Sequence, residues 1–343
     1  MLLESPPAQS GLPRTLAPMK PRLAEDAFNS PDHLFELKWD GIRALVSRDA
    51  SGLRIADRSG GDLLAAMPEL AGLQLPEGTL LDGEIIVCDS RGRPSYDLLV
   101  GRLGGRATKR GKGPIFVAFD LLYDGGRPLL GLALEERRRR LAARGLSGKG
   151  IVVPEHLASD GEPFLDVVAE FGLEGVVAKR RDGRYVPGAR SADWLKCLVT
   201  PRSDVAIGGL VVDEARGART ILCGWTDRNG TLTFAGEADV PPYLGDWLDR
   251  SSRAFRTEHS AFAGPLSLRP GMVWLRPRLV AIVDHEGRDG ALIIDGRFRA
   301  LRFDGQLDDC RPEEPVEVPT YPPTGSTDRP RLVVLHSLPF PMG

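Results

Sequence analysis

The sequence predicts an α+β fold in two domains followed by a tail. Its 343 residues suit two domains of ordinary size. Strand-like apolar runs alternate with two amphipathic helices up to residue 200, and short strands with glycine-rich turns follow, which is typical of a small β-barrel. We therefore expect an α+β domain at 1–200, a barrel at 201–312 and a proline-rich tail at 313–343.

The predicted elements follow from local hydrophobic patterns. In the first domain, strands are expected at 34–46, 80–87, 115–122, 175–178 and 193–199. Leu134 and Leu141 mark the apolar face of one helix, with Arg137–Arg140 expected on its solvated side. A second helix is expected at 164–171. The barrel strands are expected at 205–212, 220–225, 231–234, 273–283 and 291–303. In the flexible tail, Leu332–Leu335 has the composition of a docking strand.

Composition excludes several classes of protein. No apolar run is long enough to span a membrane, and the N-terminus lacks the pattern of a signal peptide. The four cysteines are far apart in the sequence, which argues against a disulfide framework or a zinc site and favours a reducing compartment. We expect a monomeric cytoplasmic protein with no membrane partner. The net charge of −2 counts mildly against nucleic-acid binding, although local basic patches matter more.

The most informative segment is Lys38-Trp39-Asp40-Gly41-Ile42-Arg43, which follows a predicted strand. Side chains alternate between the faces of a strand, so Glu36 and Lys38 share one face. Gly41 is expected to let the chain turn tightly. An acid, a lysine and an aspartate at a strand end suit phosphoryl chemistry.

Five further motifs follow in order: Arg58-Ser59-Gly60, Leu81-Asp82-Gly83-Glu84, Ala118-Phe119-Asp120-Leu121, Glu174-Gly175-Val176-Val177-Ala178-Lys179 and Arg190-Ser191-Ala192-Asp193-Trp194-Leu195-Lys196. Together with the Lys38 segment they resemble the ATP-dependent DNA ligases, which carry AMP on a lysine. The likeness is strongest to small bacterial ligases of the end-joining type. It runs from about Pro18 to Asp304.

The resemblance implies a nucleotidyltransferase (adenylation) domain followed by an OB-fold barrel. It implies sealing of nicks in duplex DNA through lysyl-AMP and an adenylylated 5′-phosphate. ATP and Mg²⁺ (or Mn²⁺) are the implied cofactors. Nicked double-stranded DNA and end-joining or repair proteins are the implied partners.

The resemblance also assigns roles around the nucleotide. Lys38 would be the nucleophile that takes AMP. Glu36 would lie beside the adenine, and Phe119 would stack on it. Arg43 and Arg58 would contact the ribose or a phosphate. Because a lysine is protonated at neutral pH, nearby cations and a metal are needed to favour the neutral, nucleophilic amine.

A second group of residues would bind the metal and the triphosphate. Glu84 and Glu174 would bind or position the catalytic metal through carboxylate oxygens. Lys179, Arg190 and Lys196 would surround the triphosphate, where positive charge neutralises the phosphates during attack.

The sequence departs from the family pattern at two positions. The family has a second lysine where this chain has Leu198, on the strand face of Lys196. The segment Arg302-Phe303-Asp304-Gly305 resembles the last family motif, in which Arg302 would orient the leaving pyrophosphate, but Gly305 replaces a lysine. Both changes remove positive charge from the phosphate path and put the rate of adenylylation in question.

Other interpretations stay open at this point. An RNA ligase or a capping-type nucleotidyltransferase would share the lysine and the folds. Leu198 and Gly305 allow a weakly active or non-catalytic DNA-end-binding protein, or an accessory module that acts with a partner. The glycine-rich segment holding Arg102, Arg106, Lys109, Arg110 and Lys112 is either a solvated loop or a contact to the DNA backbone.

Overall fold

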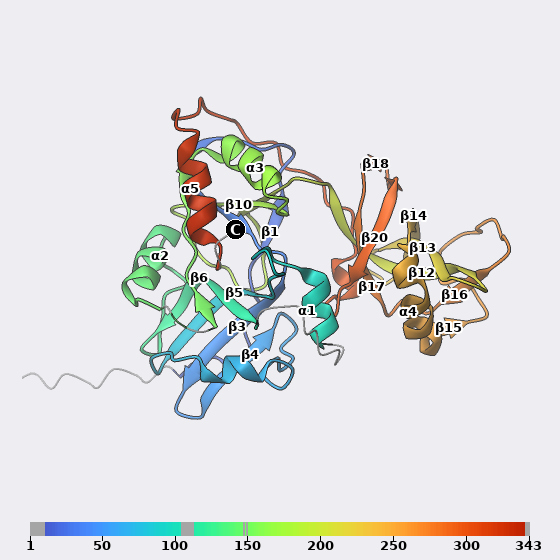
Figure 1. The fold of residues 1–343 in the computed structure, drawn as a ribbon, viewed down its shortest axis with the longest axis horizontal. Helices are drawn as coiled ribbons and strands as arrows, with labels where there is room; N and C mark the ends of the chain where they lie inside the picture. The colour runs from blue at the N-terminus through green and yellow to red at the C-terminus, as the bar shows by residue number, and fades with distance from the viewer. Residues whose placement is uncertain (1–10, 104–112, 147, 149, 340–343) are drawn as a thin grey trace, which may run out of the picture. The chain divides into compact units, whose positions relative to one another are not determined.

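The structure, a computed structural model, describes residues 11–103, 113–146, 148 and 150–339. The chain divides into two compact units, one formed by residues up to 199 together with 315 onward, the other by 200–314. Figure 1 shows the elements of both units. Within the described ranges, no helix is long and apolar enough to cross a membrane.

The first unit contains a five-stranded sheet in the order β1-β11-β10-β2-β9. Its strands are β1 (Lys20–Leu23), β2 (Ser30–Lys38), β9 (Leu157–Ser159), β10 (Gly175–Arg180) and β11 (Arg190–Leu198). One face is apolar, with Phe35, Val176 and Leu195 packed in a core cluster with helix α3 (Gly161–Glu170). The opposite face carries Glu36, Lys38, Lys179 and Lys196, because these residues alternate with the apolar ones.

A second sheet of the same unit has the order β4-β3-β5-β6-β7, with β8 paired to β6. Its strands are β3 (Ile42–Asp49), β4 (Gly52–Asp57), β5 (Thr79–Ile86), β6 (Ile115–Asp124), β7 (Arg127–Pro128) and β8 (Ile151–Val152). Helix α2 (Leu134–Ala143) packs on β6, and the helices α1 (Tyr96–Leu103) and η1 (Pro68–Gly72) lie in connections. Leu45, Leu80 and Phe119 of this sheet share a core cluster with Trp194 of the first. The charged face of the first sheet therefore meets the second sheet.

The tail returns to the first unit. Val316 pairs with Ala24 next to β1, and helix α5 (Asp328–Ser337) packs on α3 (Figure 1). Val333 and Val334 are buried in the core cluster with α3, as is Leu338. The prediction of a docking strand at Leu332–Leu335 is wrong, since these residues are helical. Buried apolar residues, rather than the prolines before them, decide how this segment folds.

The second unit is a barrel in which β13, β14, β20, β17 and β12 pair in a closed ring, with β16 and β15 added beside β12. Its strands are β12 (Arg202–Asp213), β13 (Gly217–Thr226), β14 (Leu232–Asp239), β15 (Arg256–Thr257), β16 (Met272–Leu275), β17 (Val280–Asp284), β18 (Gly287–Asp289), β19 (Leu292–Ile294) and β20 (Gly296–Leu301). Helix α4 (Pro242–Ser252) packs on β13, and η2 (Arg253–Phe255) and η3 (Leu307–Asp309) are short. The prediction of an α+β chain with a barrel is confirmed, but α4 was not expected.

Helix α5 provides a test of the tail's contribution to stability. We expect Val333→Ala/Val334→Ala to lower the free energy of unfolding by several kcal/mol, because burying an apolar side chain contributes about 1.5–3 kcal/mol. Denaturant unfolding of the full chain measures this. Leu332→Ala/Leu335→Ala is the matched control, since both leucines lie exposed on the same helix. Equal losses in the two variants would contradict the docking of α5.

Candidate active site

Lys38 stands at the end of β2, where its amine forms an ion pair with Glu174. The Lys38 Nζ and Glu174 Oε1 atoms are 2.8 Å apart, and the Glu174 side chain is almost fully buried. Glu174 immediately precedes β10, and Gly175 pairs with Lys38 across the two strands. The sequence therefore brings two predicted site residues together from motifs more than a hundred residues apart.

Gly41 holds the segment after Lys38 against β5. A side chain at this position would meet the Ile85 carbonyl oxygen at 2.3 Å and Glu84 Cγ at 2.9 Å. Its φ angle is not in the left-handed region, so close approach explains the glycine better than the tight turn that we expected. The contact places Glu84 beside the Lys38 segment.

Glu36 lies two residues before Lys38 and is buried between two cations. Lys179 donates a hydrogen bond to Glu36 Oε2 at 2.7 Å, and Arg138 Nε lies 3.4 Å from Oε1. Burial alone would raise the pKa of Glu36, but the charges of Lys179 and Arg138 outweigh it and hold that pKa below its ordinary value. Glu36 Oε1 accepts no hydrogen bond from the part of the chain that the structure describes.

Aromatic rings complete this part of the site. The Lys179 amine lies 4.0 Å from the centre of the Phe119 ring and 4.5 Å from the Trp194 ring. Phe119 and Trp194 are themselves packed edge to face. The four side chains of Glu36, Lys179, Phe119 and Trp194 form one buried cluster that combines a carboxylate, a cation and two ring faces.

Arg43 is locked in place beside the same rings. Its guanidinium makes a bidentate ion pair with buried Asp82, at 2.6 and 2.7 Å, and donates to the Met19 carbonyl oxygen. Tyr185 also donates to Asp82. Burial would lower the pKa of Arg43, but Asp82 outweighs it, so the pKa is raised and the guanidinium stays charged. Arg43 lies 4.8 Å from the Phe119 ring centre.

The prediction that Arg137–Arg140 lie on the solvated side of the helix is wrong for two of these arginines. Arg137 and Arg138 are buried, not solvated. Arg137 forms a bidentate pair with Asp120, and Arg138 donates to the Phe119 carbonyl oxygen. The sequence held a signal for this, because Leu134, Arg137, Arg138 and Leu141 fall at i, i+3, i+4 and i+7. Together these arginines fix the strand that carries Phe119.

The remaining predicted residues of the first unit are spread around this cluster. Lys196 shares a row across the sheet with Val177 and Glu36, and Leu198 shares a row with Gly175 and Lys38. Arg190 begins β11, is exposed, and donates to the Pro21 carbonyl oxygen. Arg58 lies in the turn after β4. The roles of all these side chains stay predictions.

The basic segment is only partly described. Arg102 lies in α1 and forms an ion pair with Glu69. Arg106, Lys109, Arg110 and Lys112 lie outside the described residues.

Arg302 belongs to the second unit, where its Nε donates to Asp204 Oδ1 at 2.8 Å. Gly305 follows closely, and a Cβ atom there would lie 2.7 Å from Val280 Cβ and 3.0 Å from the Arg302 carbonyl oxygen. Close packing within this unit therefore explains why residue 305 is a glycine and not a lysine. The consequence that we drew from the sequence, the loss of a positive charge, is separate from this cause.

The carboxylates available suit a metal that is shared with phosphates. Among the described residues, no group of three or more His, Cys, Asp or Glu side chains could hold an ion alone. Mg²⁺ commonly takes one or two carboxylates and completes its shell with substrate phosphates and water. Glu174, which contacts Lys38, and Glu84, which lies beside Gly41, fit that kind of site.

Known proteins resemble this chain in sequence and in fold. Residues 16–197 match the family described as ATP dependent DNA ligase domain, and the chain belongs to that family. A solved structure described as mycobacterial DNA ligase D complexed with ATP and MES has a TM-score of 0.62 and 33% identity, covering 88% of this chain and 99% of that one. The fold is therefore that of a nucleotidyltransferase domain with an OB-fold barrel, as predicted.

Curated relatives agree in sequence. The multifunctional non-homologous end joining DNA repair protein LigD of Mycobacterium tuberculosis (strain H37Rv) is 36% identical over 298 residues, which is 82% of this chain. The SPbeta prophage-derived DNA ligase-like protein LigB of Bacillus subtilis is 30% identical over 194 residues, or 57% of this chain and 71% of LigB. The chain spans 37% of the length of that LigD relative.

The buried Glu36 predicts a defined pH dependence. Because its pKa is lowered by folding, its stabilising contribution is present above its ordinary pKa of 4.5 and is lost as pH falls through the folded pKa. We expect Glu36→Gln to lose about 3 kcal/mol at neutral pH, since Lys179 is left buried without its counter-charge. Urea unfolding of variant and wild type should show this difference shrinking below about pH 4.5.

Glu77→Gln is the matched control, because Glu77 is exposed in the same unit. A Glu36→Gln loss that is independent of pH, or no larger than that of the control, would contradict the buried ion pair.

Proposed function

We propose that this chain seals nicks in duplex DNA with ATP, through AMP bound covalently to Lys38. The observation that carries the proposal is the position of Lys38 at the end of β2, paired with Glu174 and two residues from the buried Glu36–Lys179 pair, in a chain of the ATP-dependent DNA ligase family. Lys38, Glu36 and Lys179 thus share one face of one sheet, and the ring of Phe119, from the second sheet, lies against Lys179.

The reaction proceeds in three transfers. The Lys38 Nζ atom attacks the α-phosphorus of ATP, a P–N bond forms, and the P–O bond to pyrophosphate breaks. A 5′-phosphate of the DNA then displaces Lys38 from the AMP phosphorus. Finally the 3′-hydroxyl attacks the 5′-phosphorus, forms the phosphodiester and releases AMP. Covalent capture divides one difficult displacement into separate steps.

The base would bind at the Glu36–Phe119 cluster. Glu36 Oε1 is a buried acceptor without a hydrogen bond from the described residues, which suits the exocyclic amino group of adenine. Phe119 offers a ring face for stacking. Arg138 supports both, since it contacts the Glu36 carboxylate and the Phe119 carbonyl oxygen.

The phosphates would meet the charged groups around Lys38. Glu84 and Glu174 would hold Mg²⁺ or Mn²⁺, which supplies charge neutralisation at the transferring phosphate. Lys179, Lys196 and Arg190 would contribute positive charge, and Arg43 and Arg58 would contact the ribose or a phosphate. Arg302 of the barrel would orient the pyrophosphate. The Lys38 Nζ atom contacts Glu174 Oε1, and attack on phosphorus requires the neutral amine.

The wider setting of the activity is also part of the proposal. Nicked duplex DNA is the substrate, and end-joining or repair proteins are partners, as the name of the LigD relative suggests. The four cysteines are all buried and none forms a disulfide, which agrees with a reducing cytoplasm. We propose that the chain acts as a monomer.

The nucleophile is tested directly. We expect Lys38→Arg to abolish the labelled adduct formed with α-³²P-ATP and magnesium on a denaturing gel, because arginine keeps the charge beside Glu174 but is not a nucleophile at neutral pH. The wild type should form the adduct and seal a nicked duplex, while a matched RNA nick tests the RNA ligase alternative. An adduct that persists in the variant would refute Lys38 as the acceptor.

The two carboxylates are tested together. We expect Glu84→Ala and Glu174→Ala each to slow adenylylation by roughly 10²-fold or more, on the scale of removing a key electrostatic group. Rates at limiting and saturating magnesium measure this. Glu170→Ala is the control, since Glu170 is an exposed acid on α3. Near-wild-type rates of both variants at limiting magnesium would contradict a role of Glu84 and Glu174 in metal binding.

Leu198 tests the departure from the family pattern. It shares a row with Gly175 and Lys38, so a cation at 198 would lie about two strand spacings, roughly 10 Å, from the nucleophile. We expect slow adenylylation in the wild type and a faster rate in Leu198→Lys, measured by single-turnover adduct formation. A fast wild type that Leu198→Lys does not improve would show that another cation compensates.

A further inference from the structure

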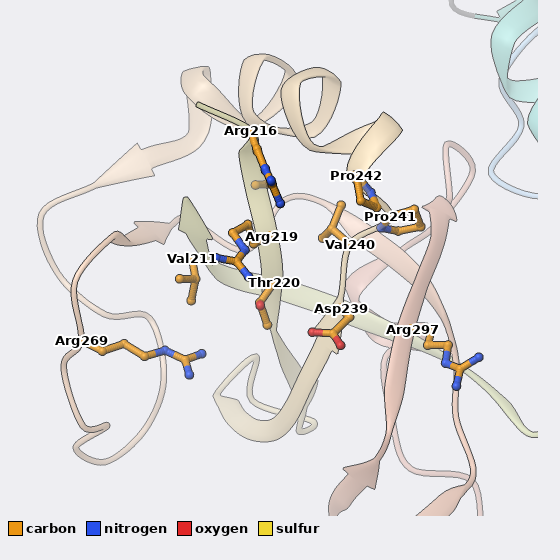
Figure 2. A pocket seen from close by; sticks show the side chains of 11 residues that line it. Val211, Arg216, Arg219, Thr220, Asp239, Val240, Pro241, Pro242, Arg269 and Arg297 are labelled. Carbon is orange, nitrogen blue, oxygen red and sulfur yellow. The ribbon is translucent and has the colours of Figure 1, made fainter. Parts of the chain in front are cut away.

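Two arginines of helix α2 are buried, although arginine side chains usually lie at the surface. Figure 2 shows the usual case in a hollow on the second unit, which is lined by the exposed residues Arg216, Arg219, Arg269 and Arg297. The side chains of Arg137 and Arg138, in contrast, are only 0% and 5% exposed. Because burying an uncompensated charge is costly, each of them must be held by specific partners.

Arg138 contacts Glu36 and fixes two backbone segments at the same time. Its Nε atom lies 3.4 Å from Glu36 Oε1. Its Nη1 and Nη2 atoms donate hydrogen bonds to the carbonyl oxygens of Phe119 and Pro154, at 3.0 and 2.5 Å. Both ends of the guanidinium fork are therefore taken by the backbone of two segments, one of which carries the Phe119 ring.

This arrangement leaves one oxygen of Glu36 available. Its Oε2 atom accepts a hydrogen bond from Lys179. Within the described ranges, Glu36 Oε1 and Arg138 Nε both lack a hydrogen-bond partner, and their separation exceeds the usual donor–acceptor distance of about 2.7–3.2 Å. Arg138 cannot turn its fork toward Glu36 without giving up a backbone contact. It therefore balances the charge of the carboxylate and leaves Oε1 able to accept a hydrogen bond from a ligand.

The fixed charge of Arg138 selects what Glu36 Oε1 can bind. An arginine in a protein does not lose its proton, and an ionised carboxylate accepts hydrogen bonds but donates none. Beside Arg138, Glu36 is held in this acceptor-only form. A purine with an amino group at position 6, such as adenine, supplies the missing donor. A purine with an oxygen there, such as guanine, would place a second acceptor against the carboxylate, which disfavours its binding.

We infer that Arg138 is a positioning residue that makes Glu36 selective for a base with an amino group at position 6. It acts through Glu36 and through the backbone of Phe119, and it does not itself contact the reacting atoms. The inference rests on the proposed function, in which the Glu36–Phe119 cluster takes the base of ATP.

The test compares the binding of ATP with that of purine riboside triphosphate, which lacks only the amino group. Calorimetry without magnesium measures both dissociation constants, since phosphoryl transfer needs the metal. We expect the wild type to prefer ATP by about 10- to 100-fold, the range for a hydrogen bond to a buried charged acceptor. In Arg138→Met the preference should fall below about threefold, because Glu36 is no longer held in place. A wild-type preference near one, or an unchanged preference in Arg138→Met, would overturn the inference.

Two further variants separate positioning from a general loss of structure. Arg138→Lys should keep most of the preference, since a lysine side chain reaches one bond beyond the Nε position and retains the charge beside Glu36. Arg137→Met should lower the unfolding temperature without changing the preference, because Arg137 pairs with Asp120 instead. Equal losses of preference in Arg137→Met and Arg138→Met would show a structural role only. If Arg137→Met does not fold, a preference lost equally in Arg138→Met and Arg138→Lys has the same meaning.

The kinetics of adduct formation give an independent measurement. We expect Arg138→Met to raise the KM for ATP and to leave the rate at saturating ATP nearly unchanged, because Lys38 and its carboxylates are intact. A lower saturating rate with an unchanged KM would contradict a role in holding the base. A wild type that forms no adduct on Lys38 would refute the proposed function, whereas the ratio of the two dissociation constants would still decide the role of Arg138.

Discussion

The site depends on charges that are buried together on one face of a sheet. Glu36, Lys179 and Arg138 are each almost fully removed from water, and so are Asp120 and Arg137 behind them. Desolvating a single such charge costs several kcal/mol, so each is tolerable only beside its partner. The pairs therefore hold strands β2, β6 and β10 and helix α2 in one arrangement. Lys38 lies two residues beyond Glu36 on the same strand, so these buried pairs also fix the position of Lys38.

The alternating patterns of β2 and β10 predicted the strands and the face shared by Glu36 and Lys38, because period-two alternation is a local property. Residues that act through distant contacts were harder to predict. Arg137 and Arg138 lie at core positions of an amphipathic helix, but only the fold supplies Asp120 and Glu36 as their partners. Helix α4 was not predicted, although Leu244, Trp247 and Leu248 fall at helical spacing. It lies between strands in the sequence, and the pattern of that region was interpreted as strands and turns throughout.

The glycines show the same division between local and distant causes. From the local sequence we interpreted Gly41 as a turn residue, and we interpreted Gly305 as the loss of a lysine charge. In the structure, Gly41 allows β5 and Glu84 to approach, and Gly305 packs on Val280. Neither neighbour is close in sequence, so no local pattern identifies these constraints. Leu198 differs from Gly305, because it belongs to the same sheet as Lys38 and shares a row with Gly175 and Lys38.

The path of the chain gives the tail a structural role that its composition does not suggest. The chain leaves the first unit after Val199, whose N–H donates to the Glu174 carbonyl oxygen, and it returns at Pro315. Val316 then exchanges hydrogen bonds with Leu23 and Glu25, beside β1, and β1 pairs with β11. Both connections to the barrel are thus anchored at the sheet that carries Lys38. Because α5 buries Val334 behind that sheet, the apolar face opposite Lys38 is completed by residues that follow the barrel in sequence.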